Sequence, residues 1–416
     1  MRGIDQRAAA QGTGFSSERL QRLTDLLEAD VAAGAIPGAV MLIAREGKLA
    51  YFEAVGFAER NALRPMQRDS IFRIASMTKP ITVIAALILQ EQGKLLLTDP
   101  LTRYIPELRT LQVGIEFVDA SGVRHLRLEA ARQPITVQDL MRHTAGFTYG
   151  DFGDSLVQRE YRRVNLLDSR QTNQEMVKKL ANLPLAYQPG STFEYGMSTD
   201  VLGRVIEIAA DMPLDQLIAT SVTTPLGMPD TAFSAPAASK PRFAQPQRGA
   251  AAPRPAAVPA AVPAEAPRSA RWCSGGGGLS STAADYARFC QMLLNGGELD
   301  GVRLVSRKTV ELMTHNHLPP GLAFGERAAE LGQAAPLPAV GQGYGRGVGV
   351  RLEPGLSPLP GSVGDFYWSG ITGPTFWVDP REKLIAVFML QEFDMQRRAR
   401  YRSLLRALVY QARLQS

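Results

Sequence analysis

The chain has 416 residues, which is enough for two or three minimal domains, or for one large body with an inserted lobe, and so for a sizeable hydrophobic core. Hydrophobic residues make up 45% and charged residues 21%, which excludes a fibrous chain and a chain that is disordered throughout. The formal net charge is +6, but the basic residues are scattered and form no run with interleaved aromatics, so we expect no nucleic-acid partner.

Cysteine and histidine usage gives little support for redox or metal chemistry. Cys273 and Cys290 are separated by a glycine run and a predicted helix, which indicates plain thiols. The chain has four histidines, and we expect neither a metal nor another cofactor. The longest apolar stretch, Ile81 to Leu89, is shorter than the roughly 20 residues of a membrane span. Because the first residues lack the apolar core of a secretory signal, we expect a cytoplasmic protein without membrane contact.

The first part of the chain combines helices and strands. An amphipathic helix is predicted after Ser16, where leucines recur at helical spacing. Two β-prone runs follow at 39–44 and 49–55, and the residues between them have the composition of a hairpin turn. A helix is then predicted from Ser76 to Gln92, because Pro80 fits its first turn.

The middle of the chain is predicted to be mostly helical from residue 95 to about 231. Residues 235–270 consist mainly of Ala and Pro, a composition that holds neither a regular helix nor a central strand. We expect this stretch to be a mobile loop or a surface crossing, anchored by Arg242 and Phe243. A further helix is predicted at 281–294.

The last part of the chain returns to β character before a final helix at 395–414. The predicted strands are 345–352, 365–369, 374–378 and 384–391. Strands at both ends with helices between them predict an α/β (α+β) fold, in which both termini build one antiparallel sheet and carry the helical region as an insertion. We expect residues 1–92 and 275–416 to form the sheet domain and residues 93–274 to form a mainly helical lobe, with the active site where they meet.

The tetrapeptide Ser76-Met77-Thr78-Lys79 carries the first candidate chemistry. Residues three apart share a helix face, so the amine of Lys79 can approach the hydroxyl of Ser76. A serine hydroxyl is a poor nucleophile until a base removes its proton, and a lysine serves as this base only where burial or neighbouring cations lower its pKa. The apolar helix that follows provides such surroundings. Taken alone, the pattern also fits a helix-capping serine and a solvated lysine.

Tyr195 is the second candidate, and it directly precedes a helix that we expect Ser198 or Asp200 to cap. A phenol can relay a proton once a nearby ammonium favours its phenolate form. Taken alone, Tyr195 also fits a packed aromatic residue.

A third segment ends a predicted edge strand with Trp368-Ser369-Gly370. The end of such a strand can offer a backbone N–H to a developing oxyanion, and small side chains leave room for an acyl group. By itself the segment also fits an ordinary strand and turn.

Together, in their order and spacing, the three segments resemble those of class C β-lactamases, DD-peptidases and family VIII carboxylesterases. The resemblance covers about Gly14 to Arg406 and implies a β-lactamase/transpeptidase-like fold. Further matching segments are Ile36-Pro37-Gly38-Ala39, Leu140-Met141-Arg142-His143-Thr144-Ala145-Gly146-Phe147, Gln188-Pro189-Gly190, and Gly276-Gly277-Gly278-Leu279 leading into Asp285-Tyr286-Ala287.

The resemblance implies a role for each segment. Ser76 attacks a carbonyl carbon, while Lys79 and Tyr195 share the work of base and acid. The backbone N–H groups of Ser76 and Ile371 form the oxyanion hole, and His143 is a structural residue. Substrate contacts are implied for Trp368, Ser369 and Gly370.

Two departures from the β-lactamase pattern concern the substrate. Met197 stands where class C β-lactamases have the asparagine of Tyr-x-Asn, and Trp368-Ser369-Gly370 stands where they have Lys-Thr-Gly. The loss of an amide and a cation weakens binding of an anionic β-lactam. An aromatic residue followed by two small ones resembles family VIII esterases, which implies a serine hydrolase that acts on small carboxylic esters, with short acyl chains expected.

Other functions remain open on the sequence. The same residues also fit hydrolysis of amides, β-lactams or D-amino-acid peptides, and acyl transfer to an alcohol or amine. A non-catalytic protein could keep the fold and bind a ligand in the same cleft. No Gly-x-Ser-x-Gly occurs, which argues against an α/β-hydrolase mechanism. The sequence indicates no oligomeric state.

Overall fold

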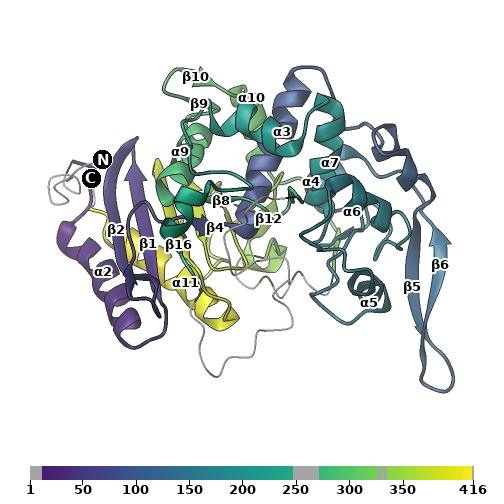
Figure 1. Cartoon of the computed structure of the whole chain (residues 1–416), viewed down its shortest axis with the longest axis horizontal. Helices are drawn as coiled ribbons and strands as arrows, with labels where there is room; N and C mark the ends of the chain where they lie inside the picture. The colour runs from purple at the N-terminus through teal and green to yellow at the C-terminus, as the bar shows by residue number, and fades with distance from the viewer. Residues whose placement is uncertain (1–11, 247–270, 326–327, 329–330, 332–334, 415–416) are drawn as a thin grey trace.

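The main element of the fold is an eight-stranded antiparallel sheet built from both ends of the chain (Figure 1). The computed structural model describes residues 12–246, 271–325, 328, 331 and 335–414. In spatial order the strands are β12 (Gln342–Tyr344), β13 (Gly349–Arg351), β14 (Phe366–Ser369), β15 (Thr375–Asp379), β16 (Leu384–Leu390), β1 (Gly38–Arg45), β2 (Lys48–Glu59) and β3 (Arg64–Pro65). Since β1 pairs with β16, the prediction that both termini share one sheet is confirmed.

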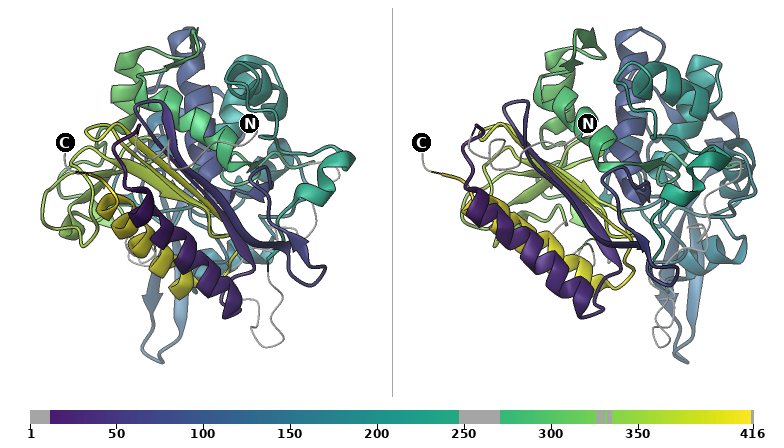
Figure 2. Two further views of the ribbon diagram at one scale, coloured as in Figure 1. Left: turned by 90° about the vertical axis from the view of Figure 1, so that its left-hand side faces the viewer. Right: turned by 60° about the vertical axis from the view of Figure 1, so that its left-hand side comes forward.

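The central strands are apolar on both faces, so each face of the sheet buries its own core. In β1, Val40 faces the larger core and Met41 the smaller one, because successive side chains of a strand point to opposite faces. The smaller core lies under α2 (Ser17–Ala32) and α11 (Met395–Gln411), which lie side by side on the sheet (Figure 2).

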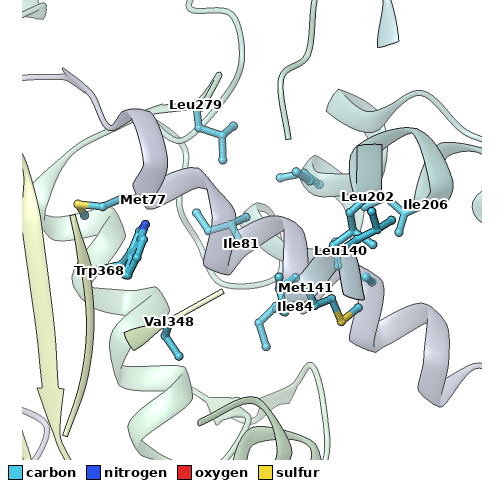
Figure 3. Packing of buried hydrophobic residues seen from close by; sticks show 14 of the residues in the cluster. Met77, Ile81, Ile84, Leu140, Met141, Leu202, Ile206, Leu279, Val348 and Trp368 are labelled. Atoms are coloured by element: carbon cyan, nitrogen blue, oxygen red, sulfur yellow. The ribbon is translucent and has the colours of Figure 1, made fainter. Parts of the chain in front are cut away.

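The larger core is centred on α3 (Thr78–Glu91), which is buried from Thr78 to Leu89. Figure 3 shows Ile81 and Ile84 of this helix packed among other apolar side chains. The other α-helices of the described residues are α4 (Val137–Met141), α5 (Leu156–Arg163), α6 (Asn173–Leu180), α7 (Ser198–Ala210), α8 (Leu214–Ile218), α9 (Ala283–Leu294) and α10 (Arg307–Thr314). None of the helices in the described ranges is both long and apolar enough to cross a membrane.

Short elements connect these helices and strands. Two-stranded ladders pair β4 (Phe72–Arg73) with β8 (Ser280–Ser281), β7 (Thr192–Phe193) with β11 (Ala323–Phe324), and β9 (Glu298–Leu299) with β10 (Val302–Arg303). Short stretches of 3-10 or π-helix occur in the described residues at Ala75–Met77, Leu101–Arg103, Pro106–Thr110, Ala219–Thr223, Ala237–Arg242 and Pro338–Val340.

A long hairpin within the predicted helical region is the main departure from the expected elements. It consists of β5 (Gln112–Val118) and β6 (Arg124–Ala130) and extends away from the body of the molecule (Figure 1). The turn is held by Asp119, whose Oδ1 accepts from the N–H groups of Ser121 and Val123. The signal was present in the sequence, because apolar and polar residues alternate along both strands on either side of a turn-like segment.

The Ala/Pro-rich stretch was expected to be anchored near its start. The anchor at Arg242 and Phe243 is confirmed, since Phe243 is buried and bridged to Ile71, while Arg242 binds the carboxylate of Asp230. Residues 247–270 of the Ala/Pro-rich stretch lie outside the described residues.

The expectation that β14 is an edge strand is wrong, because it lies between β13 and β15. β13 pairs with β14 on one side, and β12 pairs with β13 beyond it, so β12 is the edge strand at this end of the sheet.

A buried ion triad fixes the C-terminal strands to α11. Asp365 Oδ2 lies 2.9 Å from Arg351 Nε and 2.8 Å from Arg406 Nη1, and all three side chains are buried. Asp365→Asn leaves two buried guanidinium groups without a counter-charge. We therefore expect it to lower the free energy of unfolding by about 3–5 kcal/mol in urea denaturation. Asp154→Asn is the control, because exposed Asp154 pairs only at the surface, and an equal loss in both variants would contradict the prediction.

Candidate active site

Ser76 lies where a short strand turns into the helix α3. The β4–β8 ladder and a 3.1 Å hydrogen bond from the Ile74 N–H to the Leu279 carbonyl fix the chain just before it. Ala75 has a φ of 44°, in the left-handed region that residues with a side chain rarely adopt. Between residues 71 and 79, Ser76 alone is not buried, so its hydroxyl is the accessible group of this segment.

Lys79 is fully buried in the first turn of α3, and its amine is directed at Ser76. Lys79 Nζ lies 3.2 Å from Ser76 Oγ and 3.2 Å from the Tyr149 hydroxyl, and it donates to the Gly276 carbonyl at 2.7 Å. The same nitrogen lies 4.7 Å from the centroid of the Tyr195 ring. Polar partners and an aromatic face thus take the place of water around the amine and define its position.

Tyr195 lies between β7 and α7 and is packed among other aromatic side chains. Its hydroxyl accepts a hydrogen bond from Trp368 Nε1 at 3.2 Å. Ring centroids lie 4.7 Å apart between Tyr195 and His143, and 5.9 Å apart between Tyr195 and Tyr149. The phenol therefore lies beside the amine of Lys79 and also touches the third segment.

The predicted cap of α7 is wrong. The helix begins at Ser198, its N-cap position is Met197, and no side chain caps that position. The carboxylate of Asp200 instead accepts from the Ser274 hydroxyl and from the Gly276 N–H at 3.1 Å. Ser274 and Gly276 supply these two donors, and a buried carboxylate binds donors wherever the tertiary structure offers them.

The turn between β14 and β15 lies against the chain that leads into Ser76. A Cβ at Gly370 would come within 2.5 Å of the Ile74 carbonyl oxygen, so this approach requires glycine. The Thr372 hydroxyl donates to the Arg73 carbonyl at 2.8 Å. These contacts bring the third predicted segment to the first.

Ile371 lies in this turn and is held through its carbonyl, which accepts from Arg398 Nη1 of α11 at 2.5 Å. Its N–H donates to no atom of the residues that the structure describes, as an oxyanion-hole donor should. The Ser369 hydroxyl, in contrast, is engaged within the hairpin, 2.9 Å from Thr375 Oγ1.

Trp368 has a partner that the sequence did not predict, the Tyr195 hydroxyl. Trp368→Phe removes the indole N–H and keeps an aromatic ring. Because a hydrogen bond of this kind contributes about 1 kcal/mol, we expect kcat for an ester to fall roughly fivefold. Steady-state kinetics would measure this, and an unchanged kcat would contradict a role for this bond in orienting the phenol. Trp377→Phe is the matched control, since Trp377 belongs to the smaller core on the other face of the sheet.

Tyr149 was not singled out by the sequence analysis. Its hydroxyl accepts from Lys79 Nζ, and its side chain is buried. Burial, followed by the charge of Asp200, raises the pKa of Tyr149 well above its usual range, so the phenol stays protonated. The available signal was its position two residues after the matching segment Leu140 to Phe147.

His143 is buried beside Tyr195, and its Nε2 has no hydrogen-bond partner among the residues that the structure describes. Its Nδ1 accepts from the Gly196 N–H at 3.4 Å, and its ring packs on Tyr195. Burial, followed by the charge of Lys79, lowers the pKa of His143 well below its usual range, so the imidazole stays neutral. This geometry supports the structural role that the resemblance implies.

The fold, with a serine, a buried lysine and a tyrosine gathered between sheet and helices, defines a serine enzyme of the β-lactamase type. The Beta-lactamase family model matches residues 23–411, and the chain belongs to this family. Its relatives include proteins named as an esterase and as acyltransferases, and the protein is a serine hydrolase.

Three comparisons illustrate the relationship. Protein Rv1367c of Mycobacterium tuberculosis is 40% identical over 86% of each chain. Esterase EstB of Burkholderia gladioli is 31% identical over 89% of this chain and 91% of its own. The solved structure of EstCE1, described as a hydrolase with promiscuous acyltransferase activity, has a TM-score of 0.75 at 28% identity and covers 94% of this chain and 99% of its own.

Proposed function

We propose that the protein hydrolyses carboxylic esters, with short acyl chains, through an acyl-enzyme at Ser76. The observation that carries this proposal is the buried amine of Lys79, 3.2 Å from the accessible hydroxyl of Ser76. A base at hydrogen-bond distance from a serine hydroxyl is the arrangement that nucleophilic catalysis needs. The 31% identity to an esterase over most of both chains supports the ester as substrate.

In the proposed reaction, Lys79 or the neighbouring Tyr195 takes the Ser76 proton as Oγ bonds to the carbonyl carbon. The N–H groups of Ser76 and Ile371 donate to the oxyanion that forms. When the tetrahedral intermediate collapses, the alcohol leaves with the proton held by the base. Water then attacks the acyl-enzyme, gives its proton to the same base, and the acid departs as Ser76 regains its hydrogen.

The chemistry of the third segment supports a neutral substrate. Trp368 presents an indole to the Tyr195 hydroxyl at the place where class C β-lactamases carry a lysine, so no cation from this strand meets an anionic carboxylate. Met197 likewise supplies no amide after Tyr195. A β-lactam would therefore lose two polar contacts at this site, whereas a simple ester needs neither of them.

Acyl transfer is a second candidate, because EstCE1, whose solved structure is similar, is described as a hydrolase with promiscuous acyltransferase activity. An acyl-enzyme at Ser76 can be attacked by an alcohol or amine in the same way as by water. The two outcomes differ only in which nucleophile reaches the acyl carbon.

A substrate comparison on the purified protein tests the proposal. We expect p-nitrophenyl butyrate to have a higher kcat/KM than nitrocefin or D-alanine p-nitroanilide. When an alcohol is added, we expect a transfer product to the extent that the alcohol competes with water for the acyl-enzyme. Faster turnover of nitrocefin or of the D-alanyl amide than of the ester would contradict ester hydrolysis as the main activity.

A further inference from the structure

Asp200 is a buried carboxylate that does not touch Ser76 but is linked to it through the backbone. It lies in the first turn of α7 and is 1% exposed. Its Oδ1 accepts from the Ser274 hydroxyl and from the Gly276 N–H at 3.1 Å. The carbonyl of the same Gly276 accepts from Lys79 Nζ at 2.7 Å. One residue thus separates the carboxylate from the amine proposed as the base.

The peptide group between Gly275 and Gly276 is held from both sides. The Gly275 carbonyl accepts from the Thr82 hydroxyl of α3 at 2.8 Å, and the Gly276 N–H donates to Asp200. Consecutive glycines have more backbone freedom than any other residues, so the orientation of this run depends on such outside contacts. The carbonyl that holds Lys79 belongs to the next peptide group, whose Gly277 N–H donates to the Ser274 carbonyl at 3.2 Å. Because Asp200 binds both Ser274 and Gly276, it restrains this second peptide group as well.

The fit between Asp200 and the glycine run is close. A Cβ at position 276 would lie 2.3 Å from Asp200 Oδ2, so only glycine lets the backbone approach the carboxylate. Burial raises the pKa of Asp200, while the charge of Lys79 and the hydrogen bonds from Ser274 and Gly276 oppose this shift. The titratable groups that face Lys79 and Asp200 from the surrounding elements are Tyr149, Tyr195 and the neutral His143.

We propose that Asp200 is a positioning residue for the reaction at Ser76: by orienting the Gly276 peptide, it holds the amine of Lys79 against the serine hydroxyl. This inference rests on the proposed function of Ser76 and Lys79. It assigns to Asp200 no contact with the substrate. A misplacement of a reacting group by about 1 Å can cost about 100-fold in rate, which makes such a support measurable.

The experiment measures the second-order rate of Ser76 labelling by a fluorophosphonate probe, together with kcat and KM for p-nitrophenyl butyrate. Asp200→Ala removes the acceptor, and we expect labelling and kcat to fall about 10–100-fold with KM little changed. Asp200→Asn keeps an oxygen where Oδ1 accepts both hydrogen bonds, and we expect it to restore the rates to within a fewfold of wild type.

Asp285→Ala is the matched control for loss of a buried carboxylate. Asp285 lies in the first turn of α9 and accepts from the Asp230 N–H at 2.8 Å and the Thr231 hydroxyl at 3.0 Å. We expect a lower melting temperature and unchanged labelling of the folded protein.

Two outcomes would overturn the positioning role. One is labelling of Asp200→Ala at the wild-type rate, and the other is an Asp200→Asn variant as slow as Asp200→Ala, which would assign the effect to charge. Wild-type protein that neither labels nor turns over ester would instead refute the proposed function itself.

Discussion

Ser76→Ala is expected to lower the turnover of p-nitrophenyl butyrate by about 10⁴-fold or more while leaving the fold intact. The variant removes the only protein atom proposed to bond to the acyl carbon, and the remaining groups can still bind the ester but have no serine nucleophile to activate. Ser76 is partly accessible, so the loss of its hydroxyl creates no large cavity. Initial rates and the melting temperature measure the two halves of this prediction.

A second serine at a helix start serves as the control for Ser76. Ser306 is the N-cap of α10, and its hydroxyl accepts from the Thr309 N–H. Ser306→Ala should cost about 1 kcal/mol of stability through the lost cap and leave turnover unchanged. Ester hydrolysis by Ser76→Ala at a rate near that of wild type would exclude Ser76 as the nucleophile.

Lys79→Met is expected to lower kcat by about 10²–10⁴-fold, the range attributed to a positioned general base. Methionine keeps an unbranched apolar chain in the buried space, but it removes the nitrogen that lies 3.2 Å from Ser76 Oγ. Fluorophosphonate labelling of Ser76 should slow by a similar factor, because both reactions need the activated hydroxyl.

Lys79→Arg separates charge from proton transfer. Arginine keeps the positive charge but does not release its proton in the working pH range of proteins. We expect this variant to be as inactive as Lys79→Met. Wild-type activity in Lys79→Arg would show that the site needs only a cation and would contradict Lys79 as the base.

The sequence predicted best what depends on local periodicity. Strands at 39–44 and 384–391 alternate between two cores, and their apolar pattern was sufficient to place them in one sheet. The three-residue spacing of Ser76 and Lys79 on one helix face predicted the approach of hydroxyl and amine, and the structure has these atoms 3.2 Å apart.

What the sequence did not predict depends on contacts between distant segments. The hydrogen bond from Trp368 to Tyr195 joins residues 173 positions apart. The amine of Lys79 meets Tyr149 and Gly276, which reach it from two other segments. Asp200 is of a residue type that often caps helices, but it does not cap α7. It accepts instead from the Gly276 N–H, which the tertiary structure brings to it. No periodicity along the chain encodes such choices, because they are decided by which donors the fold brings together.

The most direct test of the account is to find the site at which a fluorophosphonate probe attaches to the wild-type protein. After labelling and proteolysis, mass spectrometry should locate the probe on the peptide that contains Ser76, and loss of ester turnover should follow the extent of labelling. A label on a different residue, or full ester turnover by protein that carries the label at Ser76, would contradict the acyl-enzyme mechanism.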